Sequence, residues 1–178
     1  MLQKRNDLEI MEVLRKEPSH VREIAHYLQM IPSTVLRTLS ILKGENVVDF
    51  NRRGKNTVYF LKDTLEAKSY LLLSEQYKLL KTLSQPALRR IIKECKDMAK
   101  EDLIILFGSH AKETATKSSD IDLYVETTDK DLKKKMEMIS SQLSIKIGRF
   151  DKNSPLAKEI IKDHVIMQNA ERFYHLIE

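Results

Sequence analysis

The sequence predicts an α+β protein with two domains, and three observations support this prediction. Apolar residues recur at helical spacing in three short segments of residues 8–42, and a pair of β-rich segments follows them. Leucines at helical spacing then dominate residues 64–83. Beyond residue 100, short apolar segments alternate with helical ones, which is typical of an α/β domain.

These patterns divide the 178 residues into three predicted parts. Residues 1–62 form the first domain, residues 63–85 a connecting helix, and residues 86–178 the second domain. This length agrees with two small domains, since domains typically run ~100–200 residues.

Composition excludes several classes of protein. Hydrophobic residues make up 42% and charged residues 32%, which is enough apolar material for a core. The single cysteine, Cys95, excludes an internal disulfide and a cysteine-rich zinc site, and it is compatible with a reducing cytoplasm. We expect no membrane segment, because the longest apolar stretch, residues 103–108, is far shorter than the ~18 residues of a span. Neither does the start of the sequence resemble a signal peptide.

The net charge of +5 is unevenly distributed. Residues 1–95 hold 17 Lys and Arg against 11 Asp and Glu, a net charge of +6, whereas residues 96–178 have a net charge of −1. A basic first half favours contact with a polyanion. An ordinary solvated surface would have the same charge, so the alternative stays open.

Three short helices are expected first. Their apolar positions lie in residues 8–14, 21–28 and 35–42, and the last helix ends near Gly44. Ser19 is the expected cap of the second helix, and Pro32 is expected in the first turn of the third, which Ser33 or Thr34 would cap.

A β-hairpin with a basic tip follows these helices. Its strands are residues 47–50 and 57–61, and the polar segment 51–56 between them contains Gly54. The order of three helices and a hairpin, and the segment VREIAHYLQMIPSTVLRTLSILKGENVVDF followed by NRRGKNTVYFLK, resemble the winged helix-turn-helix of regulators of the arsenic-repressor and multiple-antibiotic-resistance types. This resemblance covers residues 5–62.

A winged helix-turn-helix implies binding to double-stranded DNA. With Val35, Leu39 and Leu42 packed inward, the start of the third helix would read the major groove and the hairpin tip would meet phosphates or the minor groove. The candidate DNA-binding residues are Ser33, Thr34, Arg37, Thr38, Arg52, Arg53 and Lys55. A winged helix used for protein contacts is the alternative.

The connecting helix is too apolar for a freely solvated linker, because it contains the run YLLL. It could pack on either domain or on a second copy of the chain. A homodimer would match a two-fold operator, but the sequence does not choose among these partners.

The second domain begins with a helix over about residues 86–100, in which Cys95 lies at a core position. Strands are then expected at residues 103–107, 120–125 and 144–150, and helices at 131–143, 155–167 and 170–177.

The segment LFGSHAKETATKSSDIDLYVE resembles the signature of the DNA polymerase β nucleotidyltransferase superfamily, in its minimal branch. In that signature a strand is followed by Gly-Ser, about ten residues and Asp-x-Asp on the next strand. The resemblance covers roughly residues 86–178. It implies a nucleotidyltransferase-type α/β domain whose short mixed sheet is flanked by helices.

Elementary chemistry accounts for this spacing. Asp120 and Asp122 alternate with Ile121 and project to the same side of a strand, where a divalent cation, Mg²⁺ or Mn²⁺, would relieve their repulsion. Gly108 would let a phosphate approach the backbone, and Ser109 would donate a hydrogen bond to it. Lys112 would neutralise phosphate charge. The Asp-x-Asp pair alone is also compatible with an ordinary strand entry.

The sequence departs from the family pattern at two points. The family has a third carboxylate on the strand after the intervening helix, but the corresponding positions of this chain hold Lys146 and Gly148. Asp151 is the candidate catalytic residue there if the register of the strand differs, and Glu126 is a weaker candidate. Glu113 also stands where the family has a glycine.

Two functions therefore remain open. The first is a nucleotidyltransferase that moves a nucleoside monophosphate from a nucleoside triphosphate (NTP) to a hydroxyl acceptor, with Asp120, Asp122 and Asp151 as catalytic residues. The second is a DNA-binding regulator, or an antitoxin with a partner toxin protein, whose second domain is catalytically degenerate and senses nucleotide or binds a partner.

Overall fold

The computed structural model describes residues 2–54 and 56–178 and divides the chain into two compact units, Met1–Tyr77 and Lys78–Glu178. The division falls inside one continuous helix, α4 (Leu65–Leu83). Residues at its start contribute to the first core and residues at its end to the second, so each unit is described by itself. In the described part, no helix combines the length and the apolar character that crossing a membrane requires.

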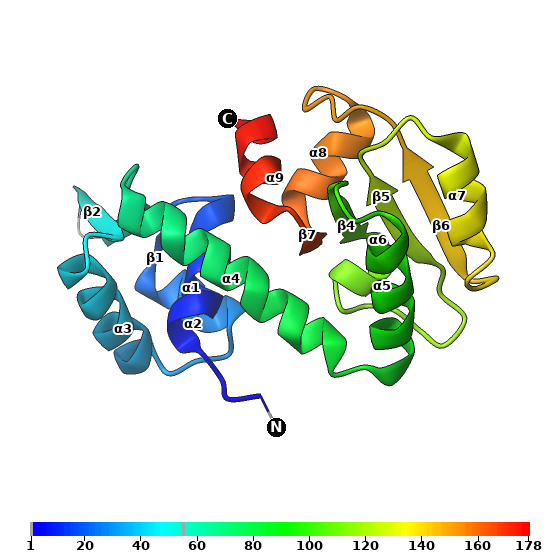
Figure 1. Ribbon diagram of the computed structural model, residues 1–178. Helices are drawn as coiled ribbons and strands as arrows, with labels where there is room; N and C mark the ends of the chain where they lie inside the picture. Colours follow the sequence, from blue (N-terminus) through cyan, green and yellow to red (C-terminus); the bar gives the residue numbers. More distant parts are fainter. Residues whose placement is uncertain (1, 55) are drawn as a thin grey trace. The chain divides into compact units, whose positions relative to one another are not determined.

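The first unit consists of three helices and a small antiparallel sheet, followed by the start of α4 (Figure 1). Its sheet has the order β1-β3-β2, in which β1 and β2 both pair with β3. The elements before α4 are α1 (Asn6–Lys16), β1 (Ser19–His20), α2 (Val21–Tyr27), α3 (Pro32–Gly44), β2 (Val48–Arg53) and β3 (Asn56–Leu61).

The core of the first unit is formed by the apolar faces that the sequence predicts. Val35, Leu39 and Leu42 of α3 are fully buried against Ile10 and Met11 of α1. The three helices and the hairpin are therefore confirmed, and together they make the winged helix-turn-helix arrangement.

Three local predictions for this unit are wrong. Ser19 does not cap α2; His20 does, because its ring accepts the Glu23 N–H while the Glu23 carboxylate accepts the His20 N–H. No side chain caps α3, although Pro32 begins it as expected. The turn is shorter than the predicted segment 51–56, because β2 continues through Arg53 and β3 begins at Asn56.

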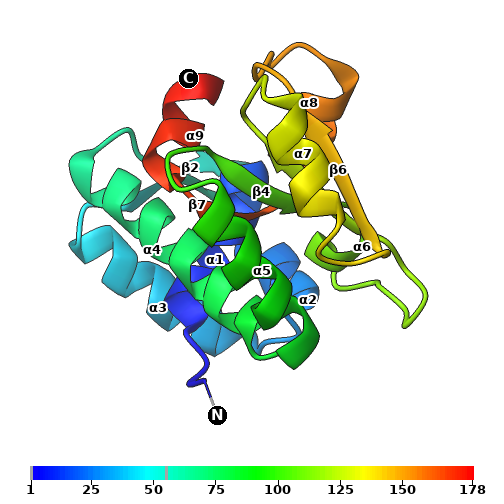
Figure 2. The ribbon, with the colours of Figure 1, turned by 45° about the vertical axis from the view of Figure 1, so that its right-hand side comes forward.

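The second unit is a four-stranded mixed sheet with helices on both faces (Figures 1 and 2). The strand order is β6-β5-β4-β7, in which β5 and β6 are parallel and the other pairs antiparallel. The strands are β4 (Ile104–Phe107), β5 (Ile121–Val125), β6 (Leu143–Ile147) and β7 (Val165–Gln168). The helices are α5 (Pro86–Met98), α6 (Gly108–Ala111), α7 (Lys130–Glu137), α8 (Pro155–Lys162) and α9 (Ala170–Ile177).

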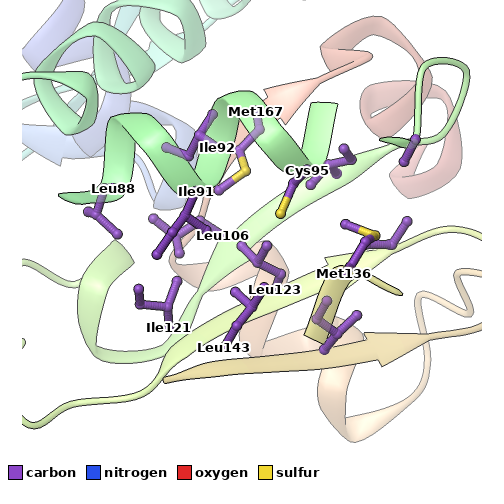
Figure 3. Close-up of a cluster of buried hydrophobic side chains, with 14 of the residues drawn as sticks. Leu88, Ile91, Ile92, Cys95, Leu106, Ile121, Leu123, Met136, Leu143 and Met167 are labelled. Atoms are coloured by element: carbon purple, nitrogen blue, oxygen red, sulfur yellow. The ribbon is translucent and has the colours of Figure 1, made fainter. Parts of the chain in front are cut away.

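Alternation along the strands separates an apolar face from a face that carries the candidate site. Leu106 and Leu123 point to one face and pack with Ile92 and Cys95 of α5 and Met136 of α7 (Figure 3). By the same alternation, Asp122 and Tyr124 point to the other face.

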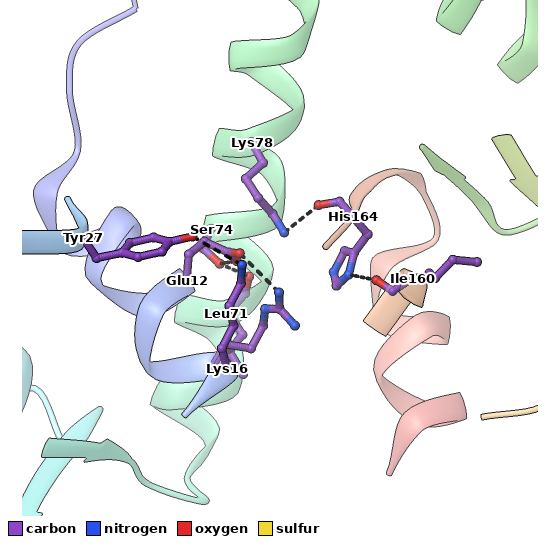
Figure 4. Close-up of polar contacts among 9 residues, drawn as sticks. Glu12, Lys16, Tyr27, Leu71, Ser74, Lys78, Ile160 and His164 are labelled. Carbon is purple, nitrogen blue, oxygen red and sulfur yellow. Dashed lines mark hydrogen bonds and ion pairs between the residues drawn. The ribbon is translucent and has the colours of Figure 1, made fainter. Parts of the chain in front are cut away.

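The face that bears Asp122 has an aromatic cluster farther along. The Phe173 ring of α9 packs on Phe150 and His164, and Phe150 packs on Tyr124. His164 is buried, its Nδ1 lies 2.6 Å from the Ile160 carbonyl oxygen, and Lys78 donates to its carbonyl (Figure 4). These contacts fix the ends of α8 and α9 beside the sheet.

Three elements of this unit differ from their sequence predictions. The expected helix 131–143 ends at Glu137, and the expected strand 144–150 is Leu143–Ile147. The expected helix 155–167 ends at Lys162, and Val165–Gln168 forms β7 at the edge of the sheet. Val165, Ile166 and Met167 are consecutive apolar residues, and so short an apolar run occurs in both buried helices and buried strands. Pairing with β4 decides the outcome, because it satisfies the backbone hydrogen bonds of a buried segment.

Candidate nucleotide and DNA sites

The first candidate site lies where β4 ends and β5 begins. Asp122 on β5 pairs with Phe107, the last residue of β4, and Gly108 follows Phe107 directly. Gly108 has φ +68°, and a Cβ on it would overlap the Asp122 carboxylate, with Cγ only 3.2 Å away. The carboxylate therefore fits against the backbone because residue 108 is a glycine.

The two aspartates lie close enough to interact electrostatically. Asp120 is exposed and directly precedes β5, while Asp122 is half-buried. Burial raises the pKa of the Asp122 carboxyl, and the charges of Asp120 and Glu159 raise it further. Interaction with Ser144 and the charge of Lys146 oppose this rise. The net direction is upward, and burial is its largest cause.

Glu159 on α8 is a member of this site that the sequence analysis missed. Its carboxylate lies 2.9 Å from the Nζ of Lys112 and contributes to the pKa of Asp122. The sequence offered no signal for it, because only the packing of α8 beside β4 brings it near β5. Lys112, the predicted phosphate contact, is therefore paired with a carboxylate whose charge also acts on Asp122.

The register of β5 and β6 determines which side chains stand beside Asp122. Asp122 is opposite Ser144, and Tyr124 is opposite Lys146, so Ser144 and Lys146 share the face of the aspartate. Lys146 is exposed, and its charge is felt at Asp122. The face of β6 beside Asp122 therefore carries a hydroxyl and an ammonium group and no carboxylate.

Asp151 does not join the two aspartates. The parallel pairing places the end of β6 beside Val125, at the end of β5 remote from Asp122, and Asp151 lies four residues beyond that end. Its carboxylate accepts the Asn153 N–H at 3.0 Å. Within residues 2–54 and 56–178, no group of three or more His, Cys, Asp or Glu is placed to hold a metal ion.

The weaker candidate, Glu126, also lies away from the pair. It follows β5 four residues after Asp122, which is ~13 Å along a strand. Its carboxylate is paired with the Arg172 guanidinium.

Glu113 has a backbone conformation that glycine adopts more easily than other residues. Its φ is +57°, in the left-handed region that glycine occupies without strain. Its carboxylate pairs with Lys81 at 3.2 Å. At this position the chain therefore combines a left-handed backbone with a charged, ion-paired side chain.

The second candidate site is the outer face of α3. Ser33 and Arg37 are exposed there as predicted, and Arg37 has no ion-pair partner among the described residues. Thr34 and Thr38 are only partly exposed, and the Thr38 hydroxyl donates to the Thr34 carbonyl at 2.9 Å. Leu36 is exposed beside Ser33 and Arg37, so the prediction that this apolar position belongs to the buried side of the helix is wrong.

The basic hairpin tip is described only in part. Arg52 is exposed on β2. Arg53 ends that strand, and the structure gives only its backbone. Lys55 lies outside the described residues.

Comparison with known families assigns both units. Residues 6–49 match the family described as bacterial regulatory protein, arsR family, and residues 88–168 match the family described as nucleotidyltransferase domain. No curated protein matched the chain.

Solved structures give weaker similarities. A mutant of Lactococcus lactis ZitR is 18% identical, with a TM-score of 0.38, and the match covers 47% of this chain and 57% of that one. A second ZitR mutant, also 18% identical, has a TM-score of 0.35 over 57% and 76% of the two chains. Human N-acetylserotonin methyltransferase in complex with SAM is 18% identical, with a TM-score of 0.35 over 54% and 28%. At these scores the family matches alone carry the assignment. The chain therefore combines a helix-turn-helix domain of the arsR type with a nucleotidyltransferase domain that follows it.

Proposed function

We propose that this chain is a cytoplasmic DNA-binding regulator whose nucleotidyltransferase domain binds a nucleoside triphosphate with Mg²⁺ and does not transfer it. The observation that carries this proposal is the register of β6, which presents Ser144 and Lys146 beside Asp122 where a third carboxylate is needed for catalysis. The arsR-type domain would bind the DNA, and this type of domain supports a homodimer on a two-fold operator.

The residues at the site fit one divalent cation with a triphosphate. Asp120 and Asp122 provide carboxylate oxygens, which Mg²⁺ accepts together with phosphate oxygens. When bound, the cation would neutralise the triphosphate and hold it against the two aspartates. Lys146 cannot ligate a cation, so its ammonium is suited to the phosphates themselves.

The chain's own groups then have defined roles. Gly108 leaves room for the Asp122 carboxylate, and the Ser109 hydroxyl is a donor at the same turn. Lys112 is held by Glu159 and can exchange that carboxylate for a phosphate. No carboxylate on β6 stands ready to accept the proton of an attacking hydroxyl.

One observation favours a second candidate function. Gly108, Asp120 and Asp122 retain the arrangement that a transferase would use, and Glu159 lies near them. If the chain is an enzyme, it transfers a nucleoside monophosphate to a hydroxyl acceptor. A partner toxin remains a prediction from the family resemblance alone.

The test measures binding and transfer with the same reagent. The full chain is titrated with α-labelled nucleoside triphosphates, with and without Mg²⁺, and then incubated with cell extract. We expect Mg²⁺-dependent binding that Asp122→Asn abolishes and that the control Asp131→Asn, on α7, retains. Label transferred by the wild type and not by Asp122→Asn would establish the second candidate instead, whereas no binding of any nucleotide would refute both.

DNA binding is tested separately with duplexes selected from a random library. Arg37→Ala should weaken binding to the selected site roughly ten- to hundredfold, the range for one lost base contact. Arg52→Ala should weaken binding to all sequences and reduce the salt slope by about one. The control Arg149→Ala, on an exposed arginine of the second unit, should change neither quantity. Failure to select any duplex would refute this part of the proposal.

A further inference from the structure

Three large apolar side chains in α3 or directly before it are left exposed, and one of them, Ile41 at 54%, lies in the third turn, away from the start of the helix. Ile31, which precedes α3, is 70% exposed, and Leu36, in its second turn, is 48% exposed. Both lie at the end of the helix that a helix-turn-helix domain inserts into the major groove. An exposed leucine alone needs no explanation, but here two flank the helix start that is expected to read bases.

The helical positions explain why Leu36 belongs to the reading face. Residues 33, 36, 37 and 40 lie on the same side of a helix, opposite the buried positions 35, 39 and 42. Leu36 therefore stands beside Ser33 and the unpaired Arg37. Thr38, by contrast, is only partly exposed, and its hydroxyl donates to the backbone of its own helix.

Positive charge in this unit favours DNA over a protein as the partner of this face. Arg37 lies on this face, and Arg52 is exposed on the hairpin of the same unit. A duplex offers phosphates for the arginines and, in its major groove, one apolar group for the leucine, the C5-methyl of thymine. A protein partner would need an acidic surface with an apolar centre, for which the family match of this domain gives no support.

We propose that Leu36, together with Ile31, reads thymine methyl groups in the major groove, so that the preferred DNA site contains thymines opposite the start of α3. This inference rests on the DNA binding proposed above and adds a specificity determinant to it. Arg37 selects guanine or contacts a phosphate, whereas the two apolar residues select the methyl group alone.

The experiment removes the methyl groups from the DNA. The duplex selected by the full chain is prepared with each thymine replaced in turn by deoxyuridine, which differs only in lacking the C5-methyl. The affinities of the wild type and of Leu36→Ala are measured for every duplex. The matched control is Leu80→Ala, since Leu80 is 52% exposed on α4. Alanine is a good helix former, so neither substitution should disturb its helix.

The expected result is a set of thymines at which deoxyuridine weakens wild-type binding about fourfold, the effect of removing one buried methyl group. The same replacement should have no effect on Leu36→Ala at one or more of these positions, whereas Leu80→Ala should keep the wild-type pattern. The thymine-to-deoxyuridine ratio should also be the same at 50 and 200 mM salt, because an apolar contact releases no counterions.

Three results would overturn the inference. Wild-type affinity could be indifferent to every replacement, or Leu36→Ala could retain every penalty of the wild type. Leu36→Ala could also leave DNA binding unchanged and alter the mass of the particle in light scattering, which would assign the face to contact between copies. If the chain selects no duplex from the random library, the proposed DNA binding itself is refuted. The first two results require a selected duplex, so they refute only the reading of thymine methyl groups.

Discussion

Replacing Gly108 by alanine tests the geometry on which the nucleotide site depends. The glycine has φ +68°, and an alanine Cβ would overlap the Asp122 carboxylate. Two other glycines separate the effects. Gly54 has φ +62° and Gly44 has no positive φ, and neither would bring a Cβ within 4 Å of another atom. Gly108→Ala therefore introduces both backbone strain and a clash, Gly54→Ala introduces backbone strain alone, and Gly44→Ala introduces neither.

The magnitudes follow from these differences. A left-handed conformation costs a residue with a Cβ ~1–2 kcal/mol, and pushing Asp122 off its rotamer adds ~0.5–1.5 kcal/mol. Gly108→Ala should therefore destabilise the second unit by about 1.5–3.5 kcal/mol, and Gly54→Ala should destabilise the first by about 1–2 kcal/mol. Gly44→Ala, inside α3, should be neutral or stabilising by up to about 1 kcal/mol.

Calorimetry and nucleotide titration measure the outcome. For a unit of 101 residues, the expected loss in Gly108→Ala lowers Tm by about 10 °C or more. Nucleotide binding should also be lost in Gly108→Ala and kept in the other two variants, because only this variant displaces Asp122. Unchanged Tm and unchanged binding in Gly108→Ala would refute the account of the close approach.

Three further predictions concern single side chains. Burial raises the pKa of the Cys95 thiol to about 12, so a thiol reagent at pH 8 should label it only after unfolding. The free energy of unfolding should also fall above about pH 8.5, because the thiol of the unfolded chain ionises there. Rapid labelling of the folded protein would contradict this. Hydrogen bonds from the backbone of Leu132 and Asp131 lower the pKa of the Asp129 carboxyl at the start of α7, so its contribution to stability should be present at pH 7 and lost below about pH 4. Chemical unfolding of Asp129→Asn at both pH values checks this, since a difference from wild type that persists in acid would exclude it. Lys146→Ala should weaken triphosphate binding about tenfold, the loss of one charge-assisted contact, and equal affinities would remove Lys146 from the site.

The elements of the fold that the sequence predicted best are those with a clear period. The apolar positions of α1, α2 and α3 repeat at helical spacing, and each helix lies within a few residues of its predicted range. The two-residue strand β1 could not be predicted, because Ser19 and His20 show no pattern of their own and become a strand only by pairing with β3. The strand β7 was missed for a similar reason, since its backbone is satisfied by β4.

The sequence also predicted only those residues of the nucleotide site that lie close together along the chain. The Gly-Ser and Asp-x-Asp spacing is local to two neighbouring strands, so Gly108 and the aspartates could be placed from the sequence. Glu159 could not, because it comes to the site through the packing of a helix 37 residues after Asp122. Asp151 depended on the register of β6, which the pairing of Asp122 with Ser144 determines.

The two units divide the charge of the chain differently from its two halves. The first unit, residues 1–77, has a net charge of only +2, with 12 Lys and Arg against 10 Asp and Glu. Most of the excess assigned to the first half comes from residues 78–95, which belong to the second unit. The case for DNA binding therefore rests on the arsR-type domain and on the exposed arginines at α3 and β2, and bulk charge adds little to it.

The most direct test of the central claim is a titration of the full chain with an α-labelled nucleoside triphosphate and Mg²⁺, followed by analysis of the label. The account predicts saturable, Mg²⁺-dependent binding that Asp122→Asn abolishes, with the nucleotide recovered intact. Transfer of the labelled monophosphate to any acceptor, dependent on Asp122, would contradict it and establish an active transferase.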